Sequence, residues 1–244
     1  MVTPESAAAL TDRGLKRPTN EDRVLAQELA GGSLLLAVAD GVGGIAGGES
    51  ASTGAIETLA TELPKAPSDD PTKALKHAFS VANERVRAQA AERPELEGMA
   101  STLAAALVRG NKAWLANAGD SRIYLFHKGQ LRQISLDHTW ASEQIRAGRL
   151  TNEEAKSSPF RNVITRGIGV AETIEPDTSG PATLKKDDLL LLCSDGLYRF
   201  VSDTEIARVL ESGTPHSMAE RLIALANEAG GSDNISVVIF RTGS

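Results

Sequence analysis

Residues 34–50 read LLLAVADGVGGIAGGES, an apolar run that ends on one acidic side chain, Asp40, and continues into a glycine-rich turn. A short continuous apolar run that is followed by a turn is typical of a buried β-strand. A carboxylate at the end of such a strand destabilises the fold unless hydrogen bonds or a cation neutralise it. The glycines allow the backbone to turn sharply and leave room beside Asp40 for a ligand.

Three further apolar runs also end on an aspartate in a turn: Asp120 in LANAGDSR, Asp195 in LLCSDG and Asp233 in GGSDNISVVIF. An aspartate beside glycine or asparagine caps turns without any chemistry, and this explanation is sufficient for one case. It explains four cases poorly, because the strand ends of a sheet converge in space and would crowd the carboxylates together. Glu21 and Asp22 in the sequence NED add two more acids. We therefore expect one shared metal site.

The expected donor atoms of this site are all oxygen. The chain has four histidines and one cysteine, with no cluster spaced for zinc, so Mg²⁺ or Mn²⁺ is the expected metal. Two such ions about 3.5–4 Å apart can lower the pKa of a bridging water and direct the resulting hydroxide at a phosphorus centre. The phosphate oxygens also need a guanidinium, and Arg17, four residues before Glu21, is the candidate. The pattern predicts phosphoester hydrolysis without a covalent enzyme intermediate.

The hydrophobic pattern predicts many strands and few helices. Strands are expected at 24–29, 34–39, 102–108, 113–118, 123–126, 189–193 and 235–240. Hairpin turns are expected around Gly110 and Gly129, because glycine readily adopts positive φ. Apolar residues at spacings of three and four predict helices at 49–63, 72–91, 203–211 and 217–229. Strands joined by short turns, with the helices in separate blocks, favour the α+β class with mainly antiparallel sheets.

No linker divides the chain, and we expect a single domain over residues 1–244. The pattern weakens between residues 137 and 173 into short amphipathic pieces, which we interpret as a flap inserted on the sheet framework. Pro71 suits the first position of the second helix, and Ser202 with Glu205 predicts a capping box at the start of the third.

The formal net charge of −6 argues against nucleic acid or an anionic membrane surface as the main partner, because either normally requires a basic stripe. The apolar run at 34–39 is far too short to span a membrane, and the first residues lack the basic region of a signal peptide. We expect a soluble cytoplasmic monomer. Cys193 is the single cysteine and cannot form an internal disulfide.

Seven segments together resemble a known family: TDRGLKRPTNED, AVADGVGG, LANAGDSRIYLF, DHTW, RNVITRGIG, LLCSDGLY and GGSDNISVVI. In this order and at this spacing they are similar to the bacterial branch of the metal-dependent serine/threonine protein phosphatases, the type 2C or PPM family. The resemblance extends from about Thr11 to Phe240. A single piece such as DG carries little information, whereas seven pieces in order are specific.

The resemblance implies a four-layer α-β-β-α sandwich with a binuclear Mn²⁺/Mg²⁺ centre at one edge. It implies that Asp40 bridges the two ions and that Gly41 gives its carbonyl oxygen to one of them. Asp195 and Asp233 would bind the other ion. Asp120, together with Asp195, matches a position that supports a weaker third metal in bacterial members.

The same resemblance assigns roles to residues near the N-terminus. Glu21 and Asp22 match the acidic pair that holds the second metal directly or through water, and Arg17 matches the phosphate-binding arginine. The implied activity is hydrolysis of phosphoserine and phosphothreonine in proteins. The implied partners are phosphorylated protein substrates and a eukaryotic-like serine/threonine kinase whose action the enzyme reverses.

Two positions depart from the family pattern. Val42 stands where some eukaryotic relatives have a histidine proposed as general acid, so a metal-bound water must protonate the leaving group or the step is unassisted. Arg199 stands where some members have another acid. We expect Arg199 to point away from the site, the alternative being that it weakens the metal site and contacts phosphate.

Two other side chains are interpreted as structural. His138 in DHTW is expected to be a surface or capping histidine, and Cys193 a small buried residue rather than a nucleophile.

Two alternative functions remain open. One is a binding or regulatory module that keeps the fold without catalysis, and the other is a hydrolase of small phosphoesters. Retention of every principal acid favours the protein phosphatase.

Overall fold

The apolar run that ends on Asp40 forms strand β3 (Ser33–Val42) in a computed structural model that describes residues 6–65 and 70–243. Its side chains alternate between two hydrophobic layers. Leu34, Leu36 and Val38 pack toward the opposite sheet, whereas Leu35 and Ala37 pack toward helices. The run is therefore continuously apolar because both of its faces are covered.

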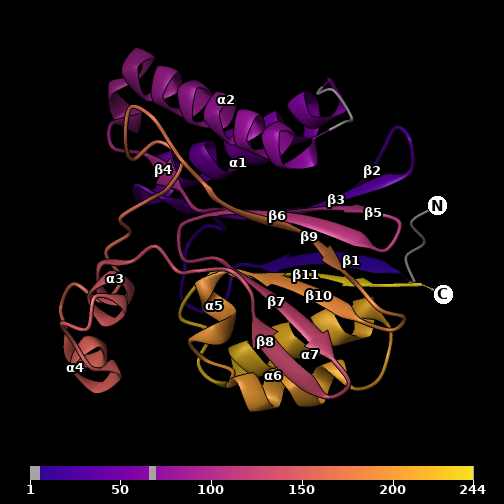
Figure 1. Cartoon of the computed structure of the whole chain (residues 1–244). Coiled ribbons are helices and arrows are strands. Elements are labelled where there is room, and N and C mark those ends of the chain that lie inside the picture. The colour runs from indigo at the N-terminus through magenta and orange to yellow at the C-terminus, as the bar shows by residue number, and fades with distance from the viewer. Residues whose placement is uncertain (1–5, 66–69, 244) are drawn as a thin grey trace.

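Two antiparallel sheets lie face to face in the centre of the molecule (Figure 1). One sheet has the order β1-β11-β10-β7-β8, with bounds Ala7–Asp12, Ile235–Arg241, Leu189–Cys193, Arg122–His127 and Gln130–Gln133. The other has the order β2-β3-β5-β6-β9, in which the strands besides β3 are Asp22–Leu29, Leu103–Arg109, Lys112–Ala118 and Asp177–Thr183. The short strand β4 (Ala100–Ser101) pairs with β3.

Helices cover the outer face of each sheet (Figure 1). Helices α1 (Gly44–Glu62) and α2 (Pro71–Glu92) pack on the sheet that contains β3. Helices α5 (Asp195–Tyr198), α6 (Asp203–Leu210) and α7 (Pro215–Glu228) pack on the other sheet. Single turns of 3₁₀ helix follow α1 and α2 at Leu63–Lys65 and Pro94–Leu96. The predicted class, an α+β sandwich with helices on both outer faces, is confirmed.

The predicted helices and strands all appear, with ends shifted by a few residues. Helix α2 begins at Pro71, and the Asp70 side chain caps it by accepting a hydrogen bond from the Lys73 backbone at 3.1 Å. The predicted capping box of Ser202 and Glu205 is present at the start of α6. The sequence does not predict β1, β4 or β9. The sequence of β9, DTSGPAT, contains no apolar alternation, and this strand lies at the edge of its sheet.

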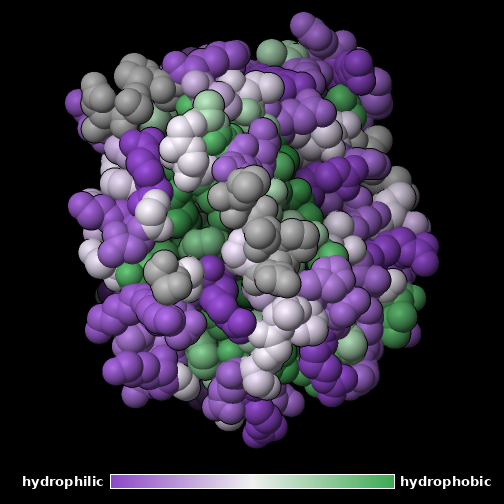
Figure 2. Space-filling view, turned by 90° about the vertical axis from the view of Figure 1, so that its right-hand side faces the viewer, coloured by the Kyte–Doolittle hydropathy of each residue, from purple (hydrophilic) through white to green (hydrophobic). Residues whose placement is uncertain are grey.

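Residues 137–173 leave the sandwich and form helices α3 (Trp140–Arg146) and α4 (Asn152–Ser157) beside it (Figure 1). Two isolated backbone bridges hold the base of this segment, Thr139 with Ile164 and Ser101 with Ile168. The start of β1 and the end of β11 lie on the opposite side of the molecule (Figure 1). There, the surface of the upper and lower layers is mainly hydrophilic, and hydrophobic residues appear chiefly in the middle (Figure 2). Within the described ranges, no helix is both long enough and apolar enough to cross a membrane.

Candidate metal centre

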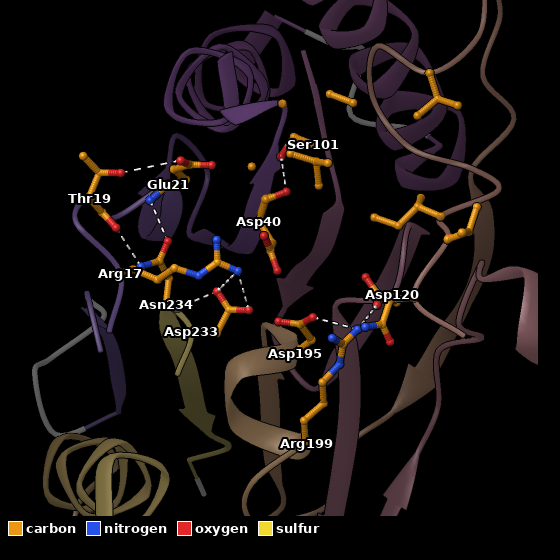
Figure 3. Close-up of a pocket in the computed structure, with 18 of the residues that line it drawn as sticks. Arg17, Thr19, Glu21, Asp40, Ser101, Asp120, Asp195, Arg199, Asp233 and Asn234 are labelled. Carbon is orange, nitrogen blue, oxygen red and sulfur yellow. Dashed lines mark hydrogen bonds and ion pairs between the residues drawn. The ribbon is translucent and has the colours of Figure 1, made fainter. Parts of the chain in front are cut away.

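A cavity of about 630 Å³ opens where strands of both sheets end (Figure 3). Its lining brings together seven of the residues that the sequence singles out: Arg17, Glu21, Asp40, Gly41, Asp120, Asp195 and Asp233. These residues come from distant parts of the chain. The expectation that the strand ends converge in space is therefore met for all of them, and Asp22 is the one predicted residue that does not line the cavity.

The backbone of Asp40 is fixed by Ser101, the last residue of β4, and by Thr102, the residue before β5. The Asp40 N–H donates to Thr102 Oγ1 at 2.9 Å, and the Thr102 N–H donates to the Asp40 carbonyl oxygen at 2.8 Å. Ser101 Oγ also donates to that carbonyl at 3.0 Å. Because these bonds fix the backbone, the carboxylate is held toward Asp195 and Asp233 in the cavity (Figure 3).

Gly41 and Gly48 allow strand β3 and helix α1 to approach each other closely. A Cβ atom on Gly41 would overlap the carbonyl oxygen of Gly48, and a Cβ atom on Gly48 would overlap the carboxylate of Glu21. Gly41 is therefore required by backbone packing, whereas a side chain at Gly48 would displace the Glu21 carboxylate. This close packing places Glu21 at the cavity and leaves the Gly41 backbone exposed to it.

Asn234 organises the loop that carries Arg17 and Glu21, a role that the sequence analysis does not assign. Its Oδ1 accepts a hydrogen bond from the Glu21 N–H at 2.8 Å. Its Nδ2 donates to the carbonyl oxygens of Arg13 and Thr19, both at 2.9 Å. The only sequence signal for this role is a polar residue at the start of the apolar run in SDNISVVIF.

Asp22 lies behind the cavity, directly opposite Asp40 in the pairing of β2 with β3. It is 1% exposed. Its Oδ2 accepts from Ser194 Oγ at 2.7 Å, and Ser194 Oγ in turn accepts from the Ser236 N–H at 3.0 Å. Oδ1 of Asp22 is buried and has no hydrogen-bond partner in the described part of the chain. A buried carboxylate oxygen without a partner is costly, which points to a ligand that is still needed at this position.

The carboxylates disfavour one another's charge. Burial raises the pKa of Asp40 well above its usual value, and four neighbouring acids raise it further: Asp22, Asp195, Asp120 and Asp233. Burial is also the main reason that the pKa of Asp22 is raised to about 6 and that of Asp195 to about 7. Bound cations would favour the charged forms of these acids and so lower their pKa values again.

Two arginines supply part of the missing positive charge (Figure 3). Arg17 pairs with Asp233 at 2.9 Å, and its side chain is 51% exposed. Arg199 pairs with Asp195 at 2.8 Å and with Asp120 at 3.1 Å. The expectation that Arg199 points away from the site is therefore wrong. Helix α5 is a single turn, and this turn brings the side chains of Asp195 and Arg199 to the same face.

The negative charge that the two arginines leave unneutralised suits Mg²⁺ or Mn²⁺. Within the described residues, no three Asp, Glu, His or Cys side chains are arranged to hold one ion by themselves. These ions need less, because they bind through one or two carboxylates and keep several water molecules. The partnerless oxygen of Asp22, the crowding around Asp40, the exposed backbone of Gly41 and the all-oxygen donor set match such ions.

His138 and Cys193 are both structural, and of the two roles expected for His138, surface or capping, the structure shows the capping one. It is 1% exposed, its Nδ1 accepts from the Gly119 N–H at 3.1 Å, and its Nε2 lies 2.9 Å from Asp177 Oδ2. Burial lowers the pKa of His138. Cys193 is buried in β10, and burial raises the pKa of its thiol, so it is not an activated nucleophile.

Comparison with known proteins places these features in a family context. The sequence profile described as protein phosphatase 2C matches residues 16–229. The serine/threonine protein phosphatase PstP of Mycobacterium tuberculosis is 43% identical over 232 residues, which are 95% of this chain and 44% of PstP. The protein phosphatase PhpP of Streptococcus pneumoniae is 36% identical over 234 residues, which are 94% of each chain. The chain thus spans less than half the length of PstP and nearly all of PhpP.

Solved structures agree with the sequence comparison. The crystal structure of Mycobacterium tuberculosis PstP is similar with a TM-score of 0.88 and 41% identity, covering 98% of each chain. A structure of the PstP catalytic domain in complex with two manganese ions has a TM-score of 0.86 and 40% identity, again covering 98% of each chain. This chain is therefore similar to these structures in both its fold and its sequence.

The raised pKa values of Asp22 and Asp195 predict an unusual pH dependence for protein freed of divalent ions with EDTA. Both groups keep a proton in the folded state that the unfolded chain releases near pH 4, so their contribution to stability is lost as the pH rises to about 7. Asp22→Asn should flatten this loss and raise the free energy of unfolding at pH 8 by on the order of 2 kcal/mol. Urea unfolding at pH 5 and pH 8 measures both effects.

The matched control for this comparison is Asp187→Asn, because Asp187 is exposed and has a positive φ of 65° that asparagine also tolerates. It should keep the wild-type dependence on pH. An Asp22→Asn variant with the same pH slope as the wild type, or with lower stability at pH 8, would contradict the raised pKa of Asp22.

Proposed function

The chain belongs to the protein phosphatase 2C family, and from that premise we propose that it hydrolyses phosphoserine and phosphothreonine in proteins. The observation that carries the proposal is the convergence of Asp40, Asp195, Asp233 and Arg17 on one cavity. The named activity of PstP supports the choice of substrate. The acids provide a place for cations, and the arginine provides a contact for phosphate.

We propose that two Mn²⁺ or Mg²⁺ ions occupy this centre, and the structure of the PstP catalytic domain in complex with two manganese ions supports this number. The proposed ligands are the carboxylates of Asp40, Asp195 and Asp233 and the carbonyl oxygen of Gly41, with Glu21 and Asp22 acting directly or through water. Such ions would lower the pKa of a water toward neutrality and so supply the nucleophile for attack on phosphorus. The chain itself positions the acids through Thr102, Ser194 and Asn234.

Arg17 is proposed to bind the phosphoryl group. Its guanidinium lies at the cavity, half exposed, and one nitrogen, Nη2, contacts both carboxylate oxygens of Asp233 at 2.9 Å. A guanidinium has five N–H donors in a planar fork, so the others are available to phosphate oxygens. Asp233 therefore holds Arg17 in the orientation in which it receives the substrate.

The leaving oxygen is proposed to receive its proton from water. Among the described residues that line the cavity there is no histidine, cysteine or lysine. Val42 is 44% exposed at the rim and cannot donate a proton. The aspartates of the lining are assigned to the cations, and Ser101 Oγ donates to the Asp40 carbonyl oxygen, so we propose that no side chain forms a covalent intermediate.

We propose that residues 1–244 form one catalytic domain and that residues 137–173 act as its flap. Asn162, Val163, Ile164 and Val170 from this segment line the cavity, where they would contact the protein substrate. We propose a monomer as the catalytic unit, because this chain by itself supplies the acids and the arginine that the proposed centre needs. The substrates of such an enzyme are products of serine/threonine kinases, and we propose that a kinase of this class is its counterpart.

Removal of single carboxylates from the centre should abolish turnover. With a phosphothreonine peptide and Mn²⁺, Asp40→Asn and Asp195→Asn are expected to lower kcat/KM by at least about 100-fold, because each loses a charge needed to hold the ions. Asp187→Asn, an exposed aspartate away from the cavity, should keep wild-type activity. Phosphate release measured on folded variants provides the comparison.

A wild-type protein as inactive as its Asp40→Asn variant would point to a binding module that has lost catalysis. Hydrolysis of small phosphometabolites with phosphopeptides left intact would reassign the substrate class. Either result would overturn the proposed function.

Loss of Arg17 should chiefly weaken substrate binding. The expected result for Arg17→Ala is a KM raised about 10-fold or more with kcat changed little, because the phosphate group is present in both the ground state and the transition state. Arg17→Lys keeps the charge without the fork and should give an intermediate KM. Steady-state kinetics on one phosphopeptide test this, and a large fall in kcat at unchanged KM would contradict the role.

A further inference from the structure

The positive and negative charges around the cavity do not balance. Six carboxylates lie in its lining or directly behind it: Glu21, Asp22, Asp40, Asp120, Asp195 and Asp233. Among the described residues of the lining, the cations are Arg17 and Arg199. When all of these groups are charged, four negative charges remain, which equals the charge of two divalent ions. Without Arg199 the excess would be larger than two such ions neutralise.

The two arginines are held in different ways. Arg17 contacts one aspartate and is 51% exposed, which suits a group that also binds substrate. Arg199 is 31% exposed and bridges two aspartates whose side chains are 4% and 12% exposed, Asp120 and Asp195. Ion pairs with such buried partners are little screened by solvent, and loss of the cation would leave two buried charges without a partner. Arg199 is therefore a fixed part of the site.

Neighbouring groups support Arg199 in this position. The Arg199 N–H donates to the Asp195 carbonyl oxygen at 3.1 Å, so one helical turn joins the acid and the base. The preceding residue, Tyr198, donates its hydroxyl to the Asp120 carbonyl oxygen at 3.0 Å. The guanidinium of Arg122 lies 3.6 Å from the centre of the Tyr198 ring and fixes its place from the other side. The Asp120 carboxylate is thus neutralised by a cation that the protein itself supplies.

We propose that Arg199 is a built-in counter-cation for Asp120 and Asp195 and that it limits the centre to two divalent ions. The guanidinium takes up Asp120 Oδ2 and Asp195 Oδ2, the oxygens that an additional ion on this side of the cavity would need. Asp195 keeps its other oxygen for one of the two ions. The inference rests on the proposed function, because it assumes that the remaining acids hold metal.

This inference changes the role of Asp120. The sequence resemblance implies that Asp120, with Asp195, supports a weaker third metal. In this chain, Asp120 instead anchors Arg199 and Tyr198 and so closes that side of the cavity. The ions are then confined to the side formed by Asp40, Asp233 and the Gly41 backbone.

The number of Mn²⁺ ions bound per chain tests the proposal. Equilibrium dialysis of the full chain over a range of Mn²⁺ concentrations, followed by elemental analysis, should give two ions for the wild type and two for Arg199→Lys. Arg199→Asp, which replaces the cation by a further carboxylate, should bind three. Arg208→Asp is the matched control, because it makes the same change of charge at an exposed position on α6 and should still bind two.

Two further variants keep the test decisive. If Arg199→Asp fails to fold by circular dichroism, Arg199→Ala replaces it and should also bind more than two ions. The double variant Arg199→Asp with Asp120→Asn should return to two ions, because it removes one of the freed ligands. If Arg199 were purely structural, the number of bound ions would neither rise in Arg199→Asp nor return to two in the double variant.

Each result separates the inference from the function on which it rests. Three ions on the wild type, or two on a folded Arg199→Asp and Arg199→Ala, would overturn the role of Arg199 and leave the phosphatase proposal intact. No bound ion on the wild type would overturn both. Two on the wild type and three on Arg199→Asp would support both.

Discussion

The structure depends on placing like charges together at the ends of two adjacent strands. Asp22 and Asp40 face each other in the pairing of β2 with β3, where β3 is buried between two hydrophobic layers. Neither acid can move away, because the strands continue into the core and Thr102 fixes the Asp40 backbone. Burial, together with the neighbouring negative charges, raises the pKa values of both acids and accounts for the need for cations.

The rest of the sandwich brings the other acids of the site to the same edge. Strands β10 and β11 are neighbours in the opposite sheet, so Asp195, which follows β10, and Asp233, which precedes β11, meet at one place. The close packing of Gly41 on Gly48 brings the loop with Glu21 against the start of α1. Stability and function therefore oppose each other here, since the apolar layers hold in place a group of acids that is unfavourable without bound ions.

The sequence predicts the acids of the site better than the side chains that orient them. Asp40, Asp120, Asp195 and Asp233 could be identified because each follows or precedes an apolar run, and such a pattern is local. The contacts of Arg199 could not, because they depend on a single helical turn after β10 that leaves no periodic signal. The same contrast between local and long-range signals holds for the strands. The buried strands could be predicted from their apolar residues, whereas β9 could not, because its order comes from pairing with β6 rather than from its own composition.

The central claim is that the converging carboxylates are held together by two divalent cations. The most direct measurement is a crystal structure grown with Mn²⁺, with anomalous diffraction recorded at the manganese edge. Two anomalous peaks are expected in the cavity among Asp40, Asp195 and Asp233, with Arg199 still paired with Asp120. A map without a peak between these carboxylates, or with the carboxylates turned away from one another, would contradict this claim.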